Sequence, residues 1–244
     1  MKFDLSKIKL SRFDIKRSLK LPTDLNEDLA EDIGIMVGDG HIGKFKRPSN
    51  KTVDYVIVCS GNAFSDRDYV INHVKKLKLK LFSLDFPVFF AGKNSTEIRL
   101  KINSKGLLEF YTKIIGLPLN KKENIGIPRI IWKNLNFIKA CLRGIVDTDF
   151  SFDIKKNNYP VLKLKTASKK LTKDCKKAFR LMGLESSIKT DCIEIHSKTK
   201  RAYKTNYLYL SGKDKIIKYI NDIGFNNPRN LVKIKKFMGP LGNS

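Results

Sequence analysis

Two short stretches of the chain, DIGIMVGDG at residues 32–40 and LRGIVDTDF at residues 142–150, share one pattern that decides the fold. Each ends an apolar segment of helical periodicity, and in each two small residues stand four positions apart. The small pairs are Gly34 with Gly38 and Gly144 with Thr148. Because nothing protrudes between small residues at this spacing, two such helices can bring their backbones close together. We therefore predict two helices that pack against each other on a pseudo-twofold axis.

The limits of these helices follow from residues that begin and end helices. Residues 24–27 have the form of a capping box, in which Asp24 caps the helix and Glu27 bonds back to it. Gly40 is expected to end the first helix in a left-handed conformation. The first helix is predicted over Leu25–Asp39 and the second over Phe137–Asp149.

The same series of elements follows each helix. Strand-like runs are predicted at residues 41–45, 53–60, 97–102, 151–154, 161–166, 192–196 and 203–210, and helical stretches at 65–80 and 171–182. Two Ile-Gly pairs close the halves, and their glycines, Gly116 and Gly224, follow Asp39 and Asp149 by 77 and 75 residues. The chain is therefore predicted to have an α+β fold of two pseudo-symmetric αββαββα halves.

The net charge of +25 over 244 residues indicates a polyanionic partner. Nucleic acid is favoured over a membrane surface, because the basic residues are spread over strands as well as helices; a lysine-rich host proteome is the alternative explanation. We divide the chain into a basic leader at 1–23, a first repeat at 24–132, and a second repeat with a short C-terminal tail at 133–244. The second repeat carries 25 basic and 9 acidic residues. The leader is expected to form a further DNA arm, to be disordered, or to pack on the body.

Several classes of protein are excluded by composition. No apolar run reaches the roughly 20 residues that a membrane span requires, and the first 20 residues lack the apolar core of a secretory signal. The four cysteines stand singly, which argues against a zinc site or a disulfide framework. A cytoplasmic protein without a membrane partner is expected.

The strand-like runs alternate apolar with charged residues, as in Glu97–Ile102 and Val161–Lys165. This alternation is typical of antiparallel sheets with one covered face. The other face would present basic side chains to a DNA groove, unless it is an ordinary solvated face. The candidate DNA-binding residues are Lys44, Lys46, Arg47, Arg99, Lys101, Lys155, Lys163, Lys165, Lys200, Arg201 and Lys204.

Packing of the two helices would place Asp39 and Asp149 side by side at their C-terminal ends. Two carboxylates there repel each other and the negative end of each helix dipole. A divalent cation such as Mg²⁺ would relieve the repulsion, and metal-assisted phosphodiester hydrolysis is the chemistry that follows. The alternative is that both aspartates only terminate helices.

The two opening stretches, together with the closing segments IGLPLNKKENIGIP at 115–128 and IGFNNPRNLVKI at 223–234, resemble LAGLIDADG homing endonucleases in the single-chain, two-motif form. The resemblance covers residues 24–237. It implies motif helices at a central interface, antiparallel sheets that form a DNA-binding saddle, and hydrolysis of both strands of a long asymmetric DNA target. It also implies Mg²⁺ as cofactor, with Mn²⁺ as a substitute.

Carried over residue by residue, the resemblance makes Asp39 and Asp149 the metal-binding acids, one for each strand. The backbone carbonyls of Gly38 and Thr148 would complete the metal shell.

The resemblance also implies a basic residue that steers the nucleophilic water. In the first half this would be Lys121 or Lys122. In the second half, counting from the Ile-Gly pair aligns Arg229 with Lys121 and Asn230 with Lys122, and Lys233 is the alternative basic residue.

Phe150 is a second departure from the family pattern, because it stands where Gly40 stands in the first half. A phenylalanine with positive φ would cost roughly 1–2 kcal/mol. Either the turn differs there or this half is strained, with lower activity on one strand. The nearby carboxylates of Asp32, Asp147 and Asp153 are expected to be surface or capping groups.

Two alternative functions share this fold: an RNA maturase that assists splicing of a host intron, with intron RNA as partner, and a cleavage-deficient DNA-binding regulator. The maturase would be marked by loss of the two acids, which are present. The chain starts with Met1 and ends in Pro-Leu-Gly-Asn-Ser, which favours a free-standing or intron-encoded member over an intein. Two motifs in one chain predict a monomer.

Overall fold

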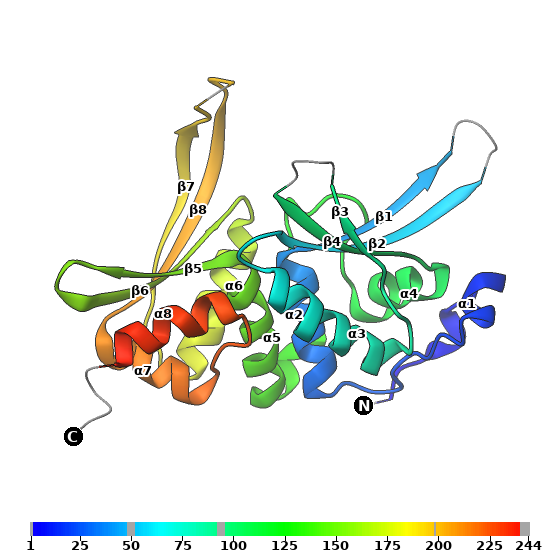
Figure 1. The fold of residues 1–244 in the computed structure, drawn as a ribbon, viewed down its shortest axis with the longest axis horizontal. Helices are drawn as coiled ribbons and strands as arrows, with labels where there is room; N and C mark the ends of the chain where they lie inside the picture. The colour runs from blue at the N-terminus through cyan, green and yellow to red at the C-terminus, as the bar shows by residue number, and fades with distance from the viewer. Residues whose placement is uncertain (1, 48–51, 92–95, 198, 240–244) are drawn as a thin grey trace.

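The computed structural model describes residues 2–47, 52–91, 96–197 and 199–239, so the last residues of the predicted C-terminal tail lie outside the described residues. Figure 1 shows two similar α+β units side by side. The elements of the first unit are α2 (Glu27–Gly38), β1 (Gly40–Lys46), β2 (Val53–Asn62), a π-helical segment (Tyr69–Val74) that continues into α3 (Lys75–Phe82), β3 (Val88–Phe90), β4 (Glu97–Asn103), α4 (Lys105–Glu109) and a second π-helical segment (Phe110–Ile115).

A 3₁₀ turn at Arg129–Lys133 leads into the second unit. Its elements are α5 (Leu135–Asp149), β5 (Phe150–Lys155), a 3₁₀ turn (Lys156–Asn158), β6 (Tyr159–Thr166), α6 (Lys169–Leu181), β7 (Ser187–Ile195), β8 (Ala202–Ser211), α7 (Lys213–Asp222) and α8 (Pro228–Met238). No helix of the described chain is long and apolar enough to cross a membrane.

Each unit contains one four-stranded antiparallel sheet, with strand order β1-β2-β4-β3 in the first and β5-β6-β8-β7 in the second. The predicted α+β fold of two pseudo-symmetric halves is confirmed. The short strand β3 was missed from the sequence, because three residues are too few to establish an alternating pattern.

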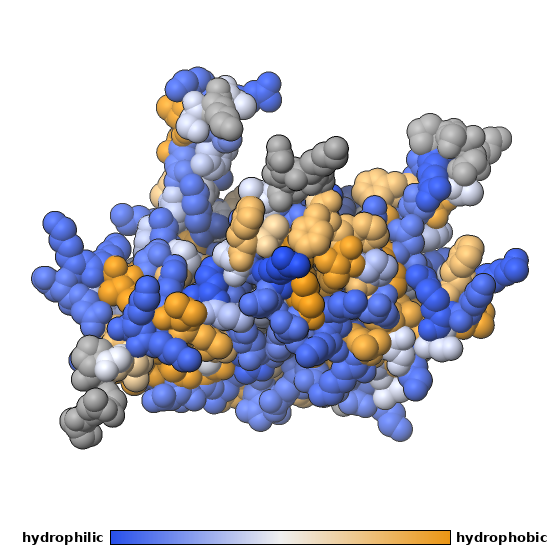
Figure 2. All heavy atoms as spheres, in the orientation of Figure 1, coloured by the Kyte–Doolittle hydropathy of each residue, from blue (hydrophilic) through white to orange (hydrophobic). Residues whose placement is uncertain are grey.

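The strand faces follow the predicted alternation. In β4, Ile98, Leu100 and Ile102 are buried under the helices, while Arg99 and Lys101 lie on the opposite face. The hairpins β1–β2 and β7–β8 extend beyond the body as two arms on the side away from most of the helices, which gives the molecule a saddle shape (Figure 1). Hydrophilic residues cover much of both arms (Figure 2).

Helices α2 and α5 form the junction between the units, and their small residues are required for the contact. A Cβ on Gly34 would lie 2.0 Å from the carbonyl oxygen of Cys141, and one on Gly144 would lie 2.4 Å from that of Glu31. A Cβ on Gly38 would lie 2.0 Å from Thr148 Oγ1. The predicted close packing of the two motif helices is therefore confirmed.

The predicted start of α2 is wrong by two residues. Its N-cap is Asn26, whose side chain accepts a hydrogen bond from the backbone N–H of Leu29. Asp24 instead pairs with Lys2 in an isolated antiparallel bridge. Asn26 can cap the helix as well as Asp24 can, and the pairing with the leader decides between them.

The predicted left-handed end at Gly40 is also wrong. Gly40 is the first residue of β1 and has no positive φ. It is glycine because a Cβ would lie 2.5 Å from Met36 Cα. The equivalent Phe150 has φ −94° and ψ 148°, which is extended backbone, and its buried ring packs edge-to-face on Phe179. Of the two alternatives for Phe150, the structure therefore shows the different turn and no strain from positive φ.

The leader packs on the first unit and does not form a separate arm. It contains a 3₁₀ turn (Leu5–Lys7) and helix α1 (Arg12–Lys16). The buried carboxylate of Asp14 accepts hydrogen bonds from Ser104 Oγ at 2.5 Å and from the backbone N–H of Gly106 at 3.0 Å. These contacts fix the leader beside β4 and α4.

Asp32 was expected to be a surface or capping group, but it lies in the core of the first unit. Its carboxylate accepts hydrogen bonds from Lys78 Nζ at 2.6 Å and from the hydroxyl of Tyr111 at 2.5 Å. All three side chains are fully buried. A buried charge requires such partners, which tie α2 to the helices that cover the first sheet.

Candidate active site

The carboxylates of Asp39 and Asp149 lie at the junction of the two units. Each stands at the C-terminal end of a motif helix, and a Cβ on Gly38 would lie 3.4 Å from Asp149 Cγ. Among the described residues neither carboxylate has a hydrogen-bond or ion-pair partner, although both are half-buried. As predicted, the two carboxylates lie close together at the ends of the motif helices.

The electrostatic cost of this arrangement appears in the pKa values. Burial raises the pKa of Asp39 to about 7, and repulsion from Asp149 and Asp66 adds to the shift. Burial raises the pKa of Asp149 to about 6, while the charge of Lys122 opposes the shift. A cation or a hydrogen-bond donor close to such carboxylates favours their anionic form.

Lys122 is the basic residue that the first unit places at these carboxylates. Its Nζ donates hydrogen bonds to the carbonyl oxygens of Gly38 at 2.6 Å and Val37 at 2.9 Å. Burial lowers the pKa of Lys122, while attraction by Asp149 and Asp39 opposes that shift. A pocket of about 310 Å³ opens beside Lys122 and Asp149. Lys121 is exposed and lies 3.8 Å from Glu123, outside this group.

Arg229 takes the corresponding position in the second unit. Its guanidinium lies 3.4 Å from the carbonyl oxygen of Asp147, the residue that stands two positions before Asp149 as Val37 stands before Asp39. It is close enough to Asp39 to lower the pKa of that carboxyl. In the structure, Arg229 thus occupies the position equivalent to that of Lys122. Counting from the Ile-Gly pair in the sequence had aligned Arg229 with Lys121.

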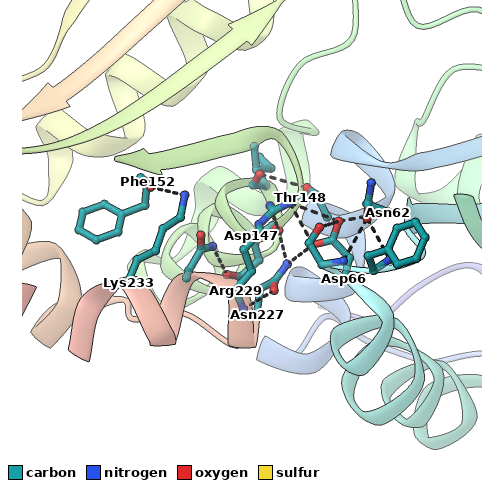
Figure 3. Close-up of polar contacts among 12 residues, drawn as sticks. Asn62, Asp66, Asp147, Thr148, Phe152, Asn227, Arg229 and Lys233 are labelled. Atoms are coloured by element: carbon teal, nitrogen blue, oxygen red, sulfur yellow. Dashed lines mark hydrogen bonds and ion pairs between the residues drawn. The ribbon is translucent and has the colours of Figure 1, made fainter. Parts of the chain in front are cut away.

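The other two candidates of the second unit point elsewhere. Asn230 is buried and donates from Nδ2 to the carboxylate of Asp147 at 3.1 Å. Lys233 Nζ donates to the carbonyl oxygen of Phe152 at 2.7 Å and lies 3.5 Å from Asp153 (Figure 3). Neither has a contact with Asp39 or Asp149 among the described residues.

Asp147 was expected to be a surface or capping group and is instead buried. Besides Asn230, it accepts a hydrogen bond from the backbone N–H of Asn226 at 2.7 Å. Burial raises the pKa of Asp147 to about 6, and these hydrogen bonds oppose the shift. Asp147 therefore holds the segment before α8 against α5.

Sequence reasoning missed Asp66, which lies next to this site. Its carboxylate binds Arg229 Nη1 at 3.0 Å and accepts a hydrogen bond from Asn227 Nδ2 at 3.0 Å (Figure 3). The two partners lie 163 and 161 positions further along the chain, so no local sequence motif predicts the contact. A carboxylate within four residues of the end of a strand was the one available signal.

The residues at the helix ends suit a hard divalent cation. Two carboxylates without protein partners, with pKa values raised by burial, form an oxygen donor set of the kind that Mg²⁺, Mn²⁺ and Ca²⁺ prefer. The Gly38 carbonyl already accepts from Lys122, and a carbonyl has a second lone pair. No group of three or more His, Cys, Asp or Glu side chains that could hold a metal exists in the described ranges. Any bound metal would therefore keep other ligands.

The candidate DNA-binding residues of the first sheet divide between its two faces. Arg99 and Lys101 lie on the face away from the helices, and Arg99 pairs with Glu97 at 2.6 Å. Lys44 and Lys46 share the helix side of β1 with Ile42, and Lys44 Nζ lies 5.9 Å from the centroid of the Tyr55 ring. Arg47, beyond the end of β1, pairs with Asp54 at 2.7 Å. Both lysines are exposed, and their contact with DNA stays a prediction.

The second sheet has a basic and aromatic outer face. Lys163 Nζ lies 4.8 Å from the Tyr207 ring centroid, and Lys165 pairs with Glu194 at 2.6 Å. Lys189, which the sequence analysis did not select, pairs in register with Tyr207 on the same face. Lys204 is exposed and alternates with this face, on the same side of β8 as Leu208. Three exposed candidates stand at hairpin ends, namely Lys155, Lys200 and Arg201.

Comparison with known proteins supports this arrangement. Residues 136–224 match the family model described as a LAGLIDADG-like domain. A crystal structure of I-DmoI in complex with DNA and Ca is 16% identical, with a TM-score of 0.61 over 86% of this chain and 97% of that one. I-DmoI with DNA and Mn is 18% identical, with a TM-score of 0.58 over 81% and 96%. The LAGLIDADG homing endonuclease I-GzeII in complex with its DNA target is 12% identical, with a TM-score of 0.51 over 88% of each chain.

Two curated proteins, both from archaeal sources, have related sequences. The replication factor C small subunit of Methanocaldococcus jannaschii is 27% identical over 87% of this chain. A protein of the A-type ATP synthase of Pyrococcus abyssi is 23% identical over 60% of this chain. The matches span only 10% and 13% of the length of those two proteins.

The fold and the central pair of motif helices thus define a protein of the LAGLIDADG homing endonuclease fold. Residues 136–224 match the LAGLIDADG-like domain model, and the sheet of the first unit has the same strand arrangement as that of the second.

Proposed function

We propose that the protein is a site-specific endonuclease that hydrolyses both strands of duplex DNA. The single observation that carries the proposal is the pair of carboxylates without protein partners, Asp39 and Asp149, at the junction of the two described units. The solved structures of the same fold named above contain DNA, and two of them contain a divalent metal.

Asp39 and Asp149 would hold Mg²⁺ or Mn²⁺, with the carbonyls of Gly38 and Thr148 as further ligands. The bound metal would lower the pKa of a water and stabilise the attacking and leaving oxygens. Lys122 fixes the end of α2 through Gly38 and is placed to donate a proton or a hydrogen bond beside Asp149. Arg229 has the same relation to α5 and Asp39.

DNA would lie across the two sheets, between the arms. The outer faces carry Arg99 and Lys101 on one side and Lys163, Lys165 and Lys189 on the other. Tyrosines beside Lys163 and Lys165 orient their ammonium groups, because a cation is attracted to the face of an aromatic ring. Phosphate contacts by lysine favour strong, salt-sensitive binding. One chain contains both halves of the site, so we expect a monomer.

The test begins with selection of a bound duplex from a randomised DNA library, followed by incubation of that duplex with Mg²⁺. We expect cleavage of both strands, and loss of double-strand cleavage in Asp39→Asn or Asp149→Asn. Cutting that persists in the double variant would overturn the two-aspartate mechanism. A duplex that binds but is never cut would identify a regulator. Binding of intron RNA in preference to every duplex would identify a maturase.

A further inference from the structure

The two halves of the site are held together by different chemistry. Each unit has a helix that follows its second strand. The residue whose carbonyl oxygen accepts the first hydrogen bond of that helix contacts the closing segment of the other unit. In the first unit this residue is Asp66, whose carbonyl accepts from Val70 at 2.8 Å; in the second it is Ser168, whose carbonyl accepts from Thr172 at 3.2 Å. The two positions are thus equivalent by topology.

Asp66 is almost fully buried, and donors surround its carboxylate. Oδ2 accepts from the backbone N–H of Asn62 at 3.0 Å, and Oδ1 accepts from Asn227 Nδ2 at 3.0 Å. Arg229 completes the set with an ion pair at 3.0 Å. Asn227 Nδ2 also donates to the carbonyl oxygen of Asp147 at 3.0 Å. Asp66 thus anchors the start of α8 to the first unit.

Ser168, at the equivalent position of the second unit, has an uncharged side chain. Its hydroxyl donates to the carbonyl oxygen of Ile125 at 2.5 Å, three residues after Lys122. Lys122 itself is placed by the carbonyls at the end of α2, without a carboxylate bonded to its Nζ among the described residues. Arg229 is therefore held by an ion pair and Lys122 by backbone carbonyls. Lys122 lies close enough to both Asp39 and Asp149 to lower the pKa of each carboxyl, whereas Arg229 lowers that of Asp39.

Arg229 is oriented by two contacts on its guanidinium. Nη1 faces Asp66, and Nη2 lies 3.4 Å from the carbonyl oxygen of Asp147. The weaker geometry of the second contact leaves Asp66 as the main constraint, since an ionic hydrogen bond is stronger than a neutral one. Without Asp66, this long side chain would be free to turn away from Asp39.

We propose that Asp66 is a positioning residue for strand cleavage, which fixes Arg229 of the second unit beside Asp39 of the first. The proposal rests on the proposed endonuclease function and makes the two cutting centres unequal. Loss of Asp66 would therefore impair the strand served by Asp39 and spare the strand served by Asp149.

The experiment follows each strand of an end-labelled target duplex separately, with Mg²⁺ and saturating protein. In Asp66→Asn, the amide retains the volume but loses the charge, and we expect cutting of one strand to slow by about tenfold or more relative to the other. Ser168→Ala is the matched control, because it removes the contact at the equivalent position of the other unit. It must not slow the same strand.

A second variant tests the same proposal if Asp66→Asn fails to fold. Arg229→Met removes the same ion pair from its other end, and we expect the same strand to slow. The Asp66→Asn, Arg229→Met double variant should be no slower than Arg229→Met alone, because the two residues act as one unit.

Equal slowing of both strands, or an unchanged strand ratio, would show that Asp66 is only a structural contact and would overturn the proposal. A wild-type protein that binds the duplex and cuts neither strand would instead overturn the endonuclease function, and the role of Asp66 with it.

Discussion

Lys122 Nζ lies 2.6 Å from the carbonyl oxygen of Gly38, the last residue of helix α2. This contact caps the negative end of the helix with a positive charge. It also places an ammonium group close to the Asp39 and Asp149 carboxylates, both of which oppose the lowering of its pKa by burial. One side chain thus joins the closing segment of the first unit to the proposed cutting site.

The first prediction concerns Lys122 and its neighbour. Lys122→Met should reduce DNA cleavage by about a hundredfold or more, because it removes the proposed proton donor beside Asp149. Lys121→Met is the control, since Lys121 is exposed and pairs only loosely with Glu123. Single-turnover cutting rates on the selected duplex measure both. Equal loss in the two variants would mean that the segment contributes only charge.

The second prediction concerns the junction of the two motif helices. Gly144→Ala should lower the free energy of unfolding by about 1–3 kcal/mol, because its Cβ would lie 2.4 Å from a backbone carbonyl oxygen that cannot move aside cheaply. Gly239→Ala, whose Cβ would come no closer than 3.1 Å to another atom, should change stability little. Urea unfolding followed by circular dichroism gives both values. Equal stability of the two variants would contradict the close contact.

The third prediction concerns Phe150. Its ring is buried against Phe179 in extended backbone, so Phe150→Gly should destabilise the protein by about 3–5 kcal/mol. The control, Ser151→Gly, places glycine at an exposed position of the same strand and should cost only about 0.5–1 kcal/mol. Thermal unfolding followed by circular dichroism compares the two variants. A stabilising effect of Phe150→Gly would instead indicate strain in the wild-type turn.

The fourth prediction is a pH dependence of stability in the absence of divalent metal. Asp39, with a pKa of about 7, and Asp149, with a pKa of about 6, bind protons more tightly in the native protein than in the unfolded chain. Their contribution is therefore most favourable at low pH and is lost as the pH rises through these values. At about pH 8, Asp39→Asn should raise the free energy of unfolding by about 1 kcal/mol and Tm by roughly 2–4 °C.

Near pH 5, Asp39 is still protonated in the native protein but ionised in the unfolded chain, so only part of the cost has developed and the same variant should have a smaller effect there. Mg²⁺ should stabilise wild-type protein more than Asp39→Asn at about pH 8, because it relieves the same repulsion. Differential scanning calorimetry at the two pH values decides the matter. An increase in Tm that is independent of pH would contradict the electrostatic explanation.

The fifth prediction concerns the DNA-binding face of the second sheet. Lys163→Ala should weaken duplex binding and reduce the slope of log Kd against log salt by about 1. Lys204→Ala is the matched control, because Lys204 lies on the opposite face of the same sheet. Fluorescence anisotropy over a range of salt concentrations measures both. Equal effects would mean that DNA reaches both faces of the second sheet.

Most of the fold was predictable because it follows from short-range patterns. Small residues four apart marked the motif helices, and alternation marked most strands within one to five residues of their ends. The predictions were wrong at positions where several local conformations were possible and a tertiary contact decides between them. Asn26 caps α2 because Asp24 pairs with the leader, and Gly40 is glycine because Met36 lies against it.

The site was predictable in its acids and only partly in its bases. Asp39 and Asp149 end helices whose periodicity is visible in the sequence, and helix packing brings them together. The choice of Lys122 over Lys121 depends on how a loop of the first unit approaches the end of α2. The choice of Arg229 over Asn230 and Lys233 depends on how the start of α8 approaches the end of α5.

The sequence by itself determined a duplicated α+β fold, two helices that must touch, two acids at their ends and a strongly basic surface. These features depend on residue type and spacing, which a chain carries before it folds. Only the tertiary structure decided which basic side chain reaches each acid, which lysines face outward, and that Asp66 binds Arg229 across 163 positions. Such contacts depend on backbone paths that are set by the packing of the whole molecule, and no local pattern encodes them.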